Sequence, residues 1–484
     1  MAIADIRDEM LDRLGPDGVI SAGPQLRTYE CDGLTGYRVR PALVVLPTTT
    51  EEVAAAVRAC HRDRVPFVAR GSGTGLSGGA LPHADGVLIV LARMRSILHI
   101  DVDNRYLVAE PGVTNAAISA AVAGDDLYYA PDPSSQIVCS IGGNVAENSG
   151  GVHCLKYGFT TNHVHGLEFV TPQGDVVQLG GPVADAPGYD LRGVVVGSEG
   201  TLGIATKVVV RLLRRPEAVQ TLLADFATPR EAGDAVTAIT SAGIVPAGME
   251  MMDNLAIQAC EEDAKVGLDL ESGAVLVVEL DGPEAEVAAA FGAAQRHCEE
   301  AGATVIRIAR DAAERALIWK GRKAAFAAMG RLSRDYFVQD GVIPRTKLGE
   351  VLERIGEMSE QTGYRVANVF HAGDGNLHPL VLYDGRNPGE ADEAEDLAIR
   401  IVELCVESGG SITGEHGVGA DKACSMPKMF GEEDLALMQR VRAAFDPRGI
   451  CNPGKVFPTP RLCGERPGPY RPHAIEQAGL AERL

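Results

Sequence analysis

The chain lacks the features that define several protein classes. Its 484 residues contain no run of about 18 apolar residues, the length that a membrane-spanning helix requires. The first residues, MAIADIRDEMLDRLG, are acidic and amphipathic, without the basic start and apolar core of a secretion signal. The net charge is −21, with 66 acidic against 45 basic residues, which argues against a general nucleic-acid-binding role. We therefore expect a cytoplasmic protein, with peripheral attachment to an inner membrane left open.

Clustered cysteines are also missing. The ten cysteines are scattered along the chain, and none forms a CxxC pair. This distribution is typical of reduced structural thiols rather than of a disulfide framework. An iron–sulfur cluster needs clustered thiolates, so we do not expect one in this chain.

Histidine is scarce, yet two of the 11 histidines flank one short turn in FHAGDGNLHPLVLYD, residues 370–384. Asp374-Gly375 is a strong turn signal, and the glycines make a helix unfavourable. A chain reversal there would let His371 and His378 converge, which is the arrangement of metal ligands. A hairpin whose histidines satisfy backbone groups fits the same stretch equally well.

Glycine is abundant, and the segment ARGSGTGLSGGA, residues 69–80, contains two familiar motifs. It matches both the dinucleotide pattern GxGxxG and the hydrolase pattern GxSxG. Each of these motifs requires a helix directly afterwards, but ALPHADGVLIV follows, with a proline and another strand. What remains is a loop rich in backbone N–H groups, suited to phosphates, or else a flexible surface loop.

Two further blocks of small residues lie in the same half of the chain. They are PDPSSQIVCSIGGNVAENSGGVHCLKYG, residues 131–158, and GSEGTLGI, residues 197–204. Three such blocks would allow the backbone to approach a long, phosphate-bearing ligand at several points. We therefore expect a dinucleotide cofactor in the first half.

The two halves differ in their patterns. In the first half, HGLEFVTPQGDVVQL predicts a hairpin that turns at residues 172–174. In the second half, apolar strands such as AVLVVEL alternate with helical patterns, including a long helix around Trp319. This order predicts an α+β domain with an antiparallel sheet.

Taken together, these motifs resemble a known family. The segments PALVVLPTTTEEV, RGSGTGLSGGA, GGNVAENSGGVHCLKYG and GSEGTLGI resemble the PCMH-type FAD-binding domain of the vanillyl-alcohol-oxidase flavoproteins. HAGDGNLH, GEHGVG and NPGK narrow the resemblance to the D-2-hydroxyacid dehydrogenase branch, and within it to the FAD-linked D subunits of glycolate oxidases. The resemblance covers residues 28–458.

The resemblance implies a fold and its boundaries. It implies an α+β protein with a lead-in (1–37), a PCMH-type FAD-binding domain (38–216), an FAD-linked oxidase C-terminal domain (217–458) and a surface tail (459–484). Within the second domain, the last segment would return to the flavin.

The resemblance also implies noncovalent FAD, because threonine stands where many relatives carry a flavin-linking histidine. The residues that would bind FAD are Gly71, Ser72, Gly73, Thr74, Gly75, Pro131, Asp132, Ser135, Gly142, Gly143, Asn148, Gly151, Glu199, Gly200, Ile204 and Asn452.

Further site residues follow from the resemblance. It makes His371, His378 and Glu415 the ligands of one divalent metal, which could be zinc, iron or manganese. His416 would be the general base, and Arg322 and Arg345 are the candidates for binding the substrate carboxylate.

The activity implied is oxidation of a small 2-hydroxy acid, glycolate or D-lactate, to the 2-oxo acid. Hydride would pass to flavin N5, with the metal polarising the substrate. Relatives that oxidise hydroxyglutarate carry a hydroxyl residue and a lysine near the places of Phe326 and Val338, which favours a monocarboxylate here. Electrons would continue to a quinone or to an iron–sulfur subunit accompanied by a second flavin-type subunit.

Three other functions remain open at this point. One is a D-lactate or D-2-hydroxyglutarate dehydrogenase that acts alone. Another is a flavin-free metal-dependent hydrolase that uses His371, His378 and Glu415. The third is a catalytically silent flavin-binding subunit, against which the intact set of site residues argues.

Overall fold

The computed structural model describes residues 2–183 and 187–458. The chain forms two compact units, and neither is continuous in sequence. Of the described residues, unit 1 comprises 2–149, 159–183, 187–214 and 415–458, and unit 2 comprises 150–158 and 215–414. The contiguous domains expected at 38–216 and 217–458 differ from these units, because residues 150–158 belong to unit 2 and residues from Glu415 onward to unit 1. The predicted tail, 459–484, lies outside the described residues.

Unit 1 contains two main sheets. In the first, of strand order β1-β2-β4-β3, β2, β3 and β4 are parallel and β1 is antiparallel. The second is antiparallel, of order β5-β6-β10-β8-β9. Their strands are β1 (Val19–Ile20), β2 (Leu43–Val45), β3 (Phe67–Arg70), β4 (Val87–Val90), β5 (Ile97–Asp101), β6 (Tyr106–Ala109), β8 (Val164–Val170), β9 (Val176–Gly180) and β10 (Ile204–Arg211). The short strands β7 (Leu127–Tyr128) and β11 (Leu213–Arg214) pair separately.

Helices complete unit 1. The buried face of α1 packs with α3 against the first sheet, and side chains of α4, α5 and α7 join the core of the second sheet. The helices are α1 (Ala2–Leu14), α2 (Gly23–Leu26), α3 (Thr50–Asp63), α4 (Asn115–Ala121), α5 (Ile141–Glu147), α7 (Leu191–Val195), α14 (Met426–Met429) and α15 (Glu432–Phe445). The β8–β9 hairpin turns at Gly174, whose φ of +89° suits glycine, and this confirms the turn expected at 172–174.

The C-terminal segment returns to the first sheet of unit 1. Phe67 of β3 donates its N–H to Ile450 and accepts one from Asn452, with distances of 2.9 and 2.8 Å. The segment therefore runs beside the strand that leads directly into the glycine-rich loop at residue 71.

Unit 2 is built on an antiparallel sheet with the main order β15-β12-β14-β13-β18-β19-β17, to which β20 and β16 are added beside β18. The strands are β12 (Ala218–Phe226), β13 (Gly248–Asp253), β14 (Ala274–Gly282), β15 (Val305–Ile308), β16 (Asp335–Val338), β17 (Gly341–Val342), β18 (Val366–His371), β19 (Asn376–Leu377) and β20 (Pro379–Tyr383). This is the antiparallel α+β arrangement that the sequence predicts.

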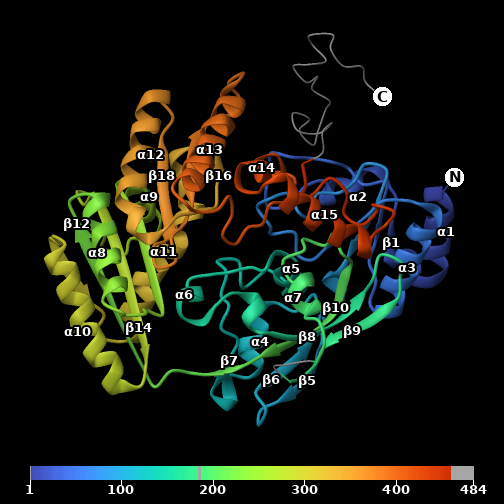
Figure 1. Ribbon diagram of the computed structural model, residues 1–484, viewed down its shortest axis with the longest axis horizontal. Helices are drawn as coiled ribbons and strands as arrows, with labels where there is room; N and C mark the ends of the chain where they lie inside the picture. Colours follow the sequence, from blue (N-terminus) through green and yellow to red (C-terminus); the bar gives the residue numbers. More distant parts are fainter. Residues whose placement is uncertain (1, 184–186, 459–484) are drawn as a thin grey trace. The chain divides into compact units, whose positions relative to one another are not determined.

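Helices cover both faces of the sheet of unit 2 (Figure 1). Strand side chains alternate, so Leu222 packs with α8, α10, α12 and α13, whereas Leu223 packs with α9 and α11. The helices are α6 (Cys154–Tyr157), α8 (Pro229–Ser241), α9 (Asn254–Ala264), α10 (Glu284–Glu300), α11 (Ala312–Leu332), α12 (Leu348–Thr362) and α13 (Glu390–Glu407). Among the described residues, no helix has the length and apolarity needed to span a lipid bilayer.

Strand β14 carries the acidic residue that anchors residues 150–158 in unit 2. Glu279 is buried and accepts hydrogen bonds from Thr221 Oγ1 at 2.6 Å, Trp319 Nε1 at 2.6 Å and Arg315 Nε at 3.0 Å, with His153 Nε2 at 3.5 Å. Burial by itself would raise the pKa of Glu279, but these donors outweigh it and lower the pKa to about 2.

Replacement of Glu279 by glutamine should destabilise the protein in a pH-dependent manner. A carboxyl whose pKa falls from 4.5 to about 2 on folding contributes about 3 kcal/mol above pH 4.5, and this contribution is lost as the pH falls towards 2. The wild-type advantage in free energy of unfolding should therefore shrink to roughly half by pH 3. Urea unfolding at pH 7 and pH 3 measures it, with Glu300→Gln on exposed α10 surface as the control. A difference that is independent of pH would contradict this account.

Candidate active site

The hairpin that joins β18 to β20 brings the two predicted metal ligands together. His371 pairs with Asn376 across the turn, Gly375 has a φ of +80°, and Asp374 Oδ1 accepts the N–H of Asn376. His371 and His378 are both buried, and their ring centroids lie 5.1 Å apart at an interplanar angle of 83°. The chain reversal predicted at Asp374-Gly375 is confirmed, and each ring offers a nitrogen within 4.8 Å of the other.

The environment of His371 suits a metal ligand. Glu250 Oε1 on β13 lies 2.6 Å from His371 Nδ1, so a proton on Nδ1 leaves Nε2 with its lone pair available for a cation. Beside the pair, the buried Oδ1 atom of Asn376 has no hydrogen-bond partner among the described residues. Two imidazoles and an unsatisfied buried oxygen form a donor set that fits a divalent metal.

Arg322 pairs with an acidic residue of the protein. Its guanidinium is buried and bonds Glu250, with Nε at 2.8 Å and Nη2 at 2.7 Å from Oε2. Glu250 therefore contacts both Arg322 and His371. Arg345 donates Nη1 to the carbonyl oxygen of Gly373 at 3.2 Å, within the turn between the two histidines. Binding of a substrate carboxylate by either arginine stays a prediction.

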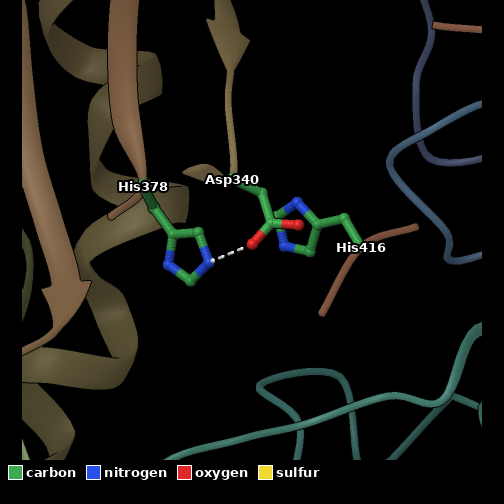
Figure 2. Close-up of side chains that lie close together, drawn as sticks. All are labelled: Asp340, His378 and His416. Carbon is green, nitrogen blue, oxygen red and sulfur yellow. Dashed lines mark ion pairs between the residues drawn. The ribbon is translucent and has the colours of Figure 1, made fainter. Parts of the chain in front are cut away.

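Asp340 is an acidic residue of this site that the sequence analysis did not single out. Its side chain is buried, and Oδ1 lies 3.6 Å from His378 Nε2 (Figure 2). Oδ2 accepts hydrogen bonds from Thr413 Oγ1 at 2.5 Å and from the N–H of Gly414 at 3.0 Å. Glu415 and His416, the predicted ligand and base, are the next two residues after Gly414.

Phe326 also borders the histidine pair. Its ring centroid lies 5.8 Å from that of His378 in an edge-on arrangement, and Val338 is buried in the adjoining core. An apolar ring therefore stands beside His378, where a hydroxyl or amine could have met a second carboxylate.

In unit 1, the first glycine-rich block forms a loop directly after β3. Gly73 has a φ of +70°, and the Arg70 side chain occupies the space where a Cβ would stand. Among the described residues, the backbone N–H groups of residues 72–75 donate to no protein acceptor. Four consecutive free donors in a partly exposed loop fit the pyrophosphate of a dinucleotide.

The second block surrounds the start of α5. Asn115 Nδ2 donates to the carbonyl oxygen of Pro131 at 3.0 Å, and Ser140 caps the helix by accepting the N–H of Gly143. Between them, Ile137 is 75% exposed and Val138 51% exposed, as expected of apolar side chains that a flat ring system could cover. The remaining predicted contacts divide between the units: Asp132, Ser135, Gly142 and Asn148 lie in unit 1, and Gly151 lies in unit 2.

The side chains of Glu199 and Asn452 make bonds within the protein rather than pointing to a free surface. Glu199 accepts the N–H groups of Val418 and Gly419, and Asn452 Nδ2 donates to the carbonyl oxygens of Gly79 and Glu199. Contact of Gly200 and Ile204 with a cofactor stays a prediction.

Comparison with known proteins agrees with this geometry. Residues 41–180 match the model of an FAD binding domain, and residues 215–456 match that of the FAD linked oxidases, C-terminal domain. The chain belongs to the FAD-linked oxidase family. It binds FAD through its first domain, and contact of the glycine-rich loop of residues 71–75 with the FAD phosphates stays a prediction.

Members of the family align with this chain over nearly the full length of both proteins. The chain is 52% identical to the glycolate oxidase subunit GlcD of Escherichia coli K12, over 92% of this chain and 90% of that protein. It is 31% identical to a D-lactate dehydrogenase of Anaerostipes hadrus, over 93% and 98% of the two chains. The crystal structure of p-cresol methylhydroxylase with substrate bound shares the fold, with a TM-score of 0.79, 17% identity and coverage of 94% and 96%.

Proposed function

We propose that this FAD-linked oxidase converts a small 2-hydroxy acid, glycolate first, to the 2-oxo acid. The observation that carries the proposal is the buried, convergent pair His371 and His378 in a chain 52% identical to a glycolate oxidase subunit. The reaction removes two electrons and two protons from the substrate. Bound FAD supplies the two-electron acceptor.

The chain's own residues bind and orient the substrate and accept its hydroxyl proton. We assign the metal to His371, His378 and Glu415, where a divalent zinc, iron or manganese ion would lower the pKa of the substrate hydroxyl. His416 is the base that takes that proton. Arg345 is the stronger candidate for the substrate carboxylate, because Arg322 already bonds Glu250.

The substrate we favour is a monocarboxylate. Phe326 beside His378 and the buried Val338 leave one wall of the site apolar, and a second carboxylate there would lose its hydration without gaining a partner. D-Lactate is the second candidate, supported by the D-lactate dehydrogenase that is 31% identical to this chain.

Anaerobic titration of the purified chain tests this function directly. We expect a visible flavin spectrum that bleaches when glycolate is added, with D-lactate weaker and D-2-hydroxyglutarate inactive. Bleaching by D-2-hydroxyglutarate alone would overturn the assignment of the apolar wall. A colourless protein that cannot be reconstituted with FAD would instead support a metal-dependent hydrolase.

For the electron acceptor, we infer a partner subunit or a quinone. The chain's cysteines are scattered and offer no cluster site, and its relative in E. coli is named as a subunit. An iron–sulfur subunit together with a second flavin-type subunit is the assembly that we propose.

A further inference from the structure

The tripeptide Glu415-His416-Gly417 is tied to a buried carboxylate at each of its ends. Unit 2 ends at Gly414, and unit 1 resumes at Glu415. Before the tripeptide, Asp340 Oδ2 accepts hydrogen bonds from the Thr413 hydroxyl and from the N–H of Gly414. The backbone carbonyl oxygen of Asp340 also accepts a hydrogen bond from the N–H of Gly414, at 3.1 Å. Asp340 is completely buried.

After the tripeptide, Glu199 makes the corresponding contacts within unit 1. Its Oε1 accepts the N–H of Val418 at 2.7 Å, and its Oε2 accepts the N–H of Gly419 at 2.6 Å. Glu199 itself has a φ of +52°, which is unusual for a residue with a side chain, and its own N–H is held by the carbonyl oxygen of Ala146 at 2.8 Å. Both oxygens of this buried carboxylate are therefore committed to one loop.

The glycines of GEHGVG are explained by the same contacts. A Cβ at Gly417 would overlap Glu147 Oε2 and lie 3.0 Å from Glu199 Oε1, and a Cβ at Gly419 would overlap the carbonyl oxygen of Ser77. Both glycines also have positive φ, +87° and +54°. The loop can therefore run close to the Ser77 backbone because Gly419 lacks a side chain, and the positive φ at both positions suits glycine.

We propose that Asp340 and Glu199 are positioning residues, which fix the backbone on either side of Glu415-His416-Gly417 and thereby hold the ligand Glu415 and the base His416 in their working conformation. The inference rests on the proposed function for the roles of Glu415 and His416. Each anchored peptide adjoins the tripeptide, Gly414 within unit 2 and Val418 within unit 1, so the backbone next to Glu415 and next to Gly417 has few conformations left to lose when substrate binds.

A second glutamate beside the loop provides a matched comparison. Glu147 is partly buried, whereas Glu199 is buried, and the Oε2 atom of Glu147 has no hydrogen-bond partner among the described residues. Burial, and then the neighbouring charges of Glu199 and Asp32, raise the pKa of Glu147 well above its usual value. Glutamine resembles a protonated glutamate, so it should replace Glu147 without altering the loop. At Glu199, however, a glutamine has only one acceptor oxygen, so one of the two hydrogen bonds from the Val418 and Gly419 N–H groups must be lost.

Amide hydrogen exchange in Glu199→Gln and Glu147→Gln tests the anchoring. In the Glu199 variant, the Val418 and Gly419 amides should exchange at least about tenfold faster than in wild type, and those of the Glu147 variant should stay within about twofold. The FAD content of the Glu147 variant should match wild type, and kcat of the Glu199 variant is expressed per bound FAD. Equal exchange in wild type and the Glu199 variant would overturn the anchoring role.

Kinetics then test whether anchoring matters for turnover. Glu199→Gln should lower kcat by about 10–100-fold with KM nearly unchanged, which is the range seen when an outer partner of a site residue is removed. Asp340→Asn should weaken metal binding by at least about tenfold in a chelator competition. If Glu199→Gln does not fold, Glu199→Asp replaces it. Aspartate retains the carboxylate but is one methylene shorter. Its amide exchange rates and its kcat should lie between the wild-type values and those predicted for Glu199→Gln.

The two levels of the proposal fail in different ways. Wild-type protein that neither binds metal nor reduces its flavin with 2-hydroxy acids would refute the proposed function, whatever the exchange data show. Active wild type accompanied by a fully active Glu199→Gln variant would leave the proposed function intact and refute the positioning role.

Discussion

His378→Ala should remove the metal and lower turnover by more than about 100-fold, a larger loss than removal of an outer-sphere partner causes. The ring is almost fully buried and lies edge-on to both His371 and Phe326, so its truncation removes one of two imidazole donors and no water-exposed surface. FAD should stay bound, because nearly all of the predicted FAD contacts lie in unit 1 whereas His378 lies in unit 2. Metal analysis, the flavin spectrum and kcat on glycolate measure the three quantities on one preparation.

His297→Ala is the matched control for this variant. His297 lies on α10 of the same unit, is 27% exposed and pairs with Glu300 on the surface. The control should keep wild-type metal content and turnover. If the His378 variant lost FAD together with the metal, the assignment of the two cofactors to separate sets of residues would be wrong.

The histidine pair could be predicted because its determinants are local. Asp374-Gly375 forms the turn, and the resulting chain reversal, together with the alternation of strand side chains, brings the two histidines together without any distant residue. The β8–β9 hairpin and the antiparallel sheet of unit 2 were predictable for the same reason, since turn residues and apolar periodicity specify them within short windows.

The partners of those histidines could not be predicted in this way. Glu250 lies on β13 and Asp340 next to β17, so their approach to the histidines depends on how strands far apart in the sequence pair. A signal was present at Glu250, an acid among the buried methionines of GMEMMD, because a charge on a buried strand requires a partner. The arginine that pairs with it is Arg322, which the sequence analysis considers only as a candidate for the substrate carboxylate.

The discontinuous units have a similar cause. The sequence places residues 150–158 in a glycine-rich block that is expected to bind the cofactor. In the structure, Lys156 and Tyr157 bond Asp281, and His153 approaches Glu279, all within unit 2. Strand β14, which carries both acids, begins more than a hundred residues later. Such long-range ion pairs leave no periodic pattern that a sequence can display.

Glu250→Gln should lower the free energy of unfolding by about 3–5 kcal/mol, because it leaves the buried guanidinium of Arg322 without a countercharge. Both side chains of this pair are almost completely excluded from solvent, at 3% and 0% exposure. Urea unfolding at pH 7 measures the loss. Glu353→Gln, which breaks the exposed pair with Arg230 at 57% and 50% exposure, should leave stability unchanged.

The added substitution Arg322→Met identifies the cause of that loss. Methionine removes the unpaired charge while filling similar space, so the double variant should recover much of the lost stability. Its metal affinity should nevertheless stay about 10–100-fold below wild type, since Glu250 also orients His371 through Nδ1. A Glu250→Gln variant as stable as wild type would mean that Arg322 does not depend on this carboxylate, and the guanidinium would then be available to a substrate.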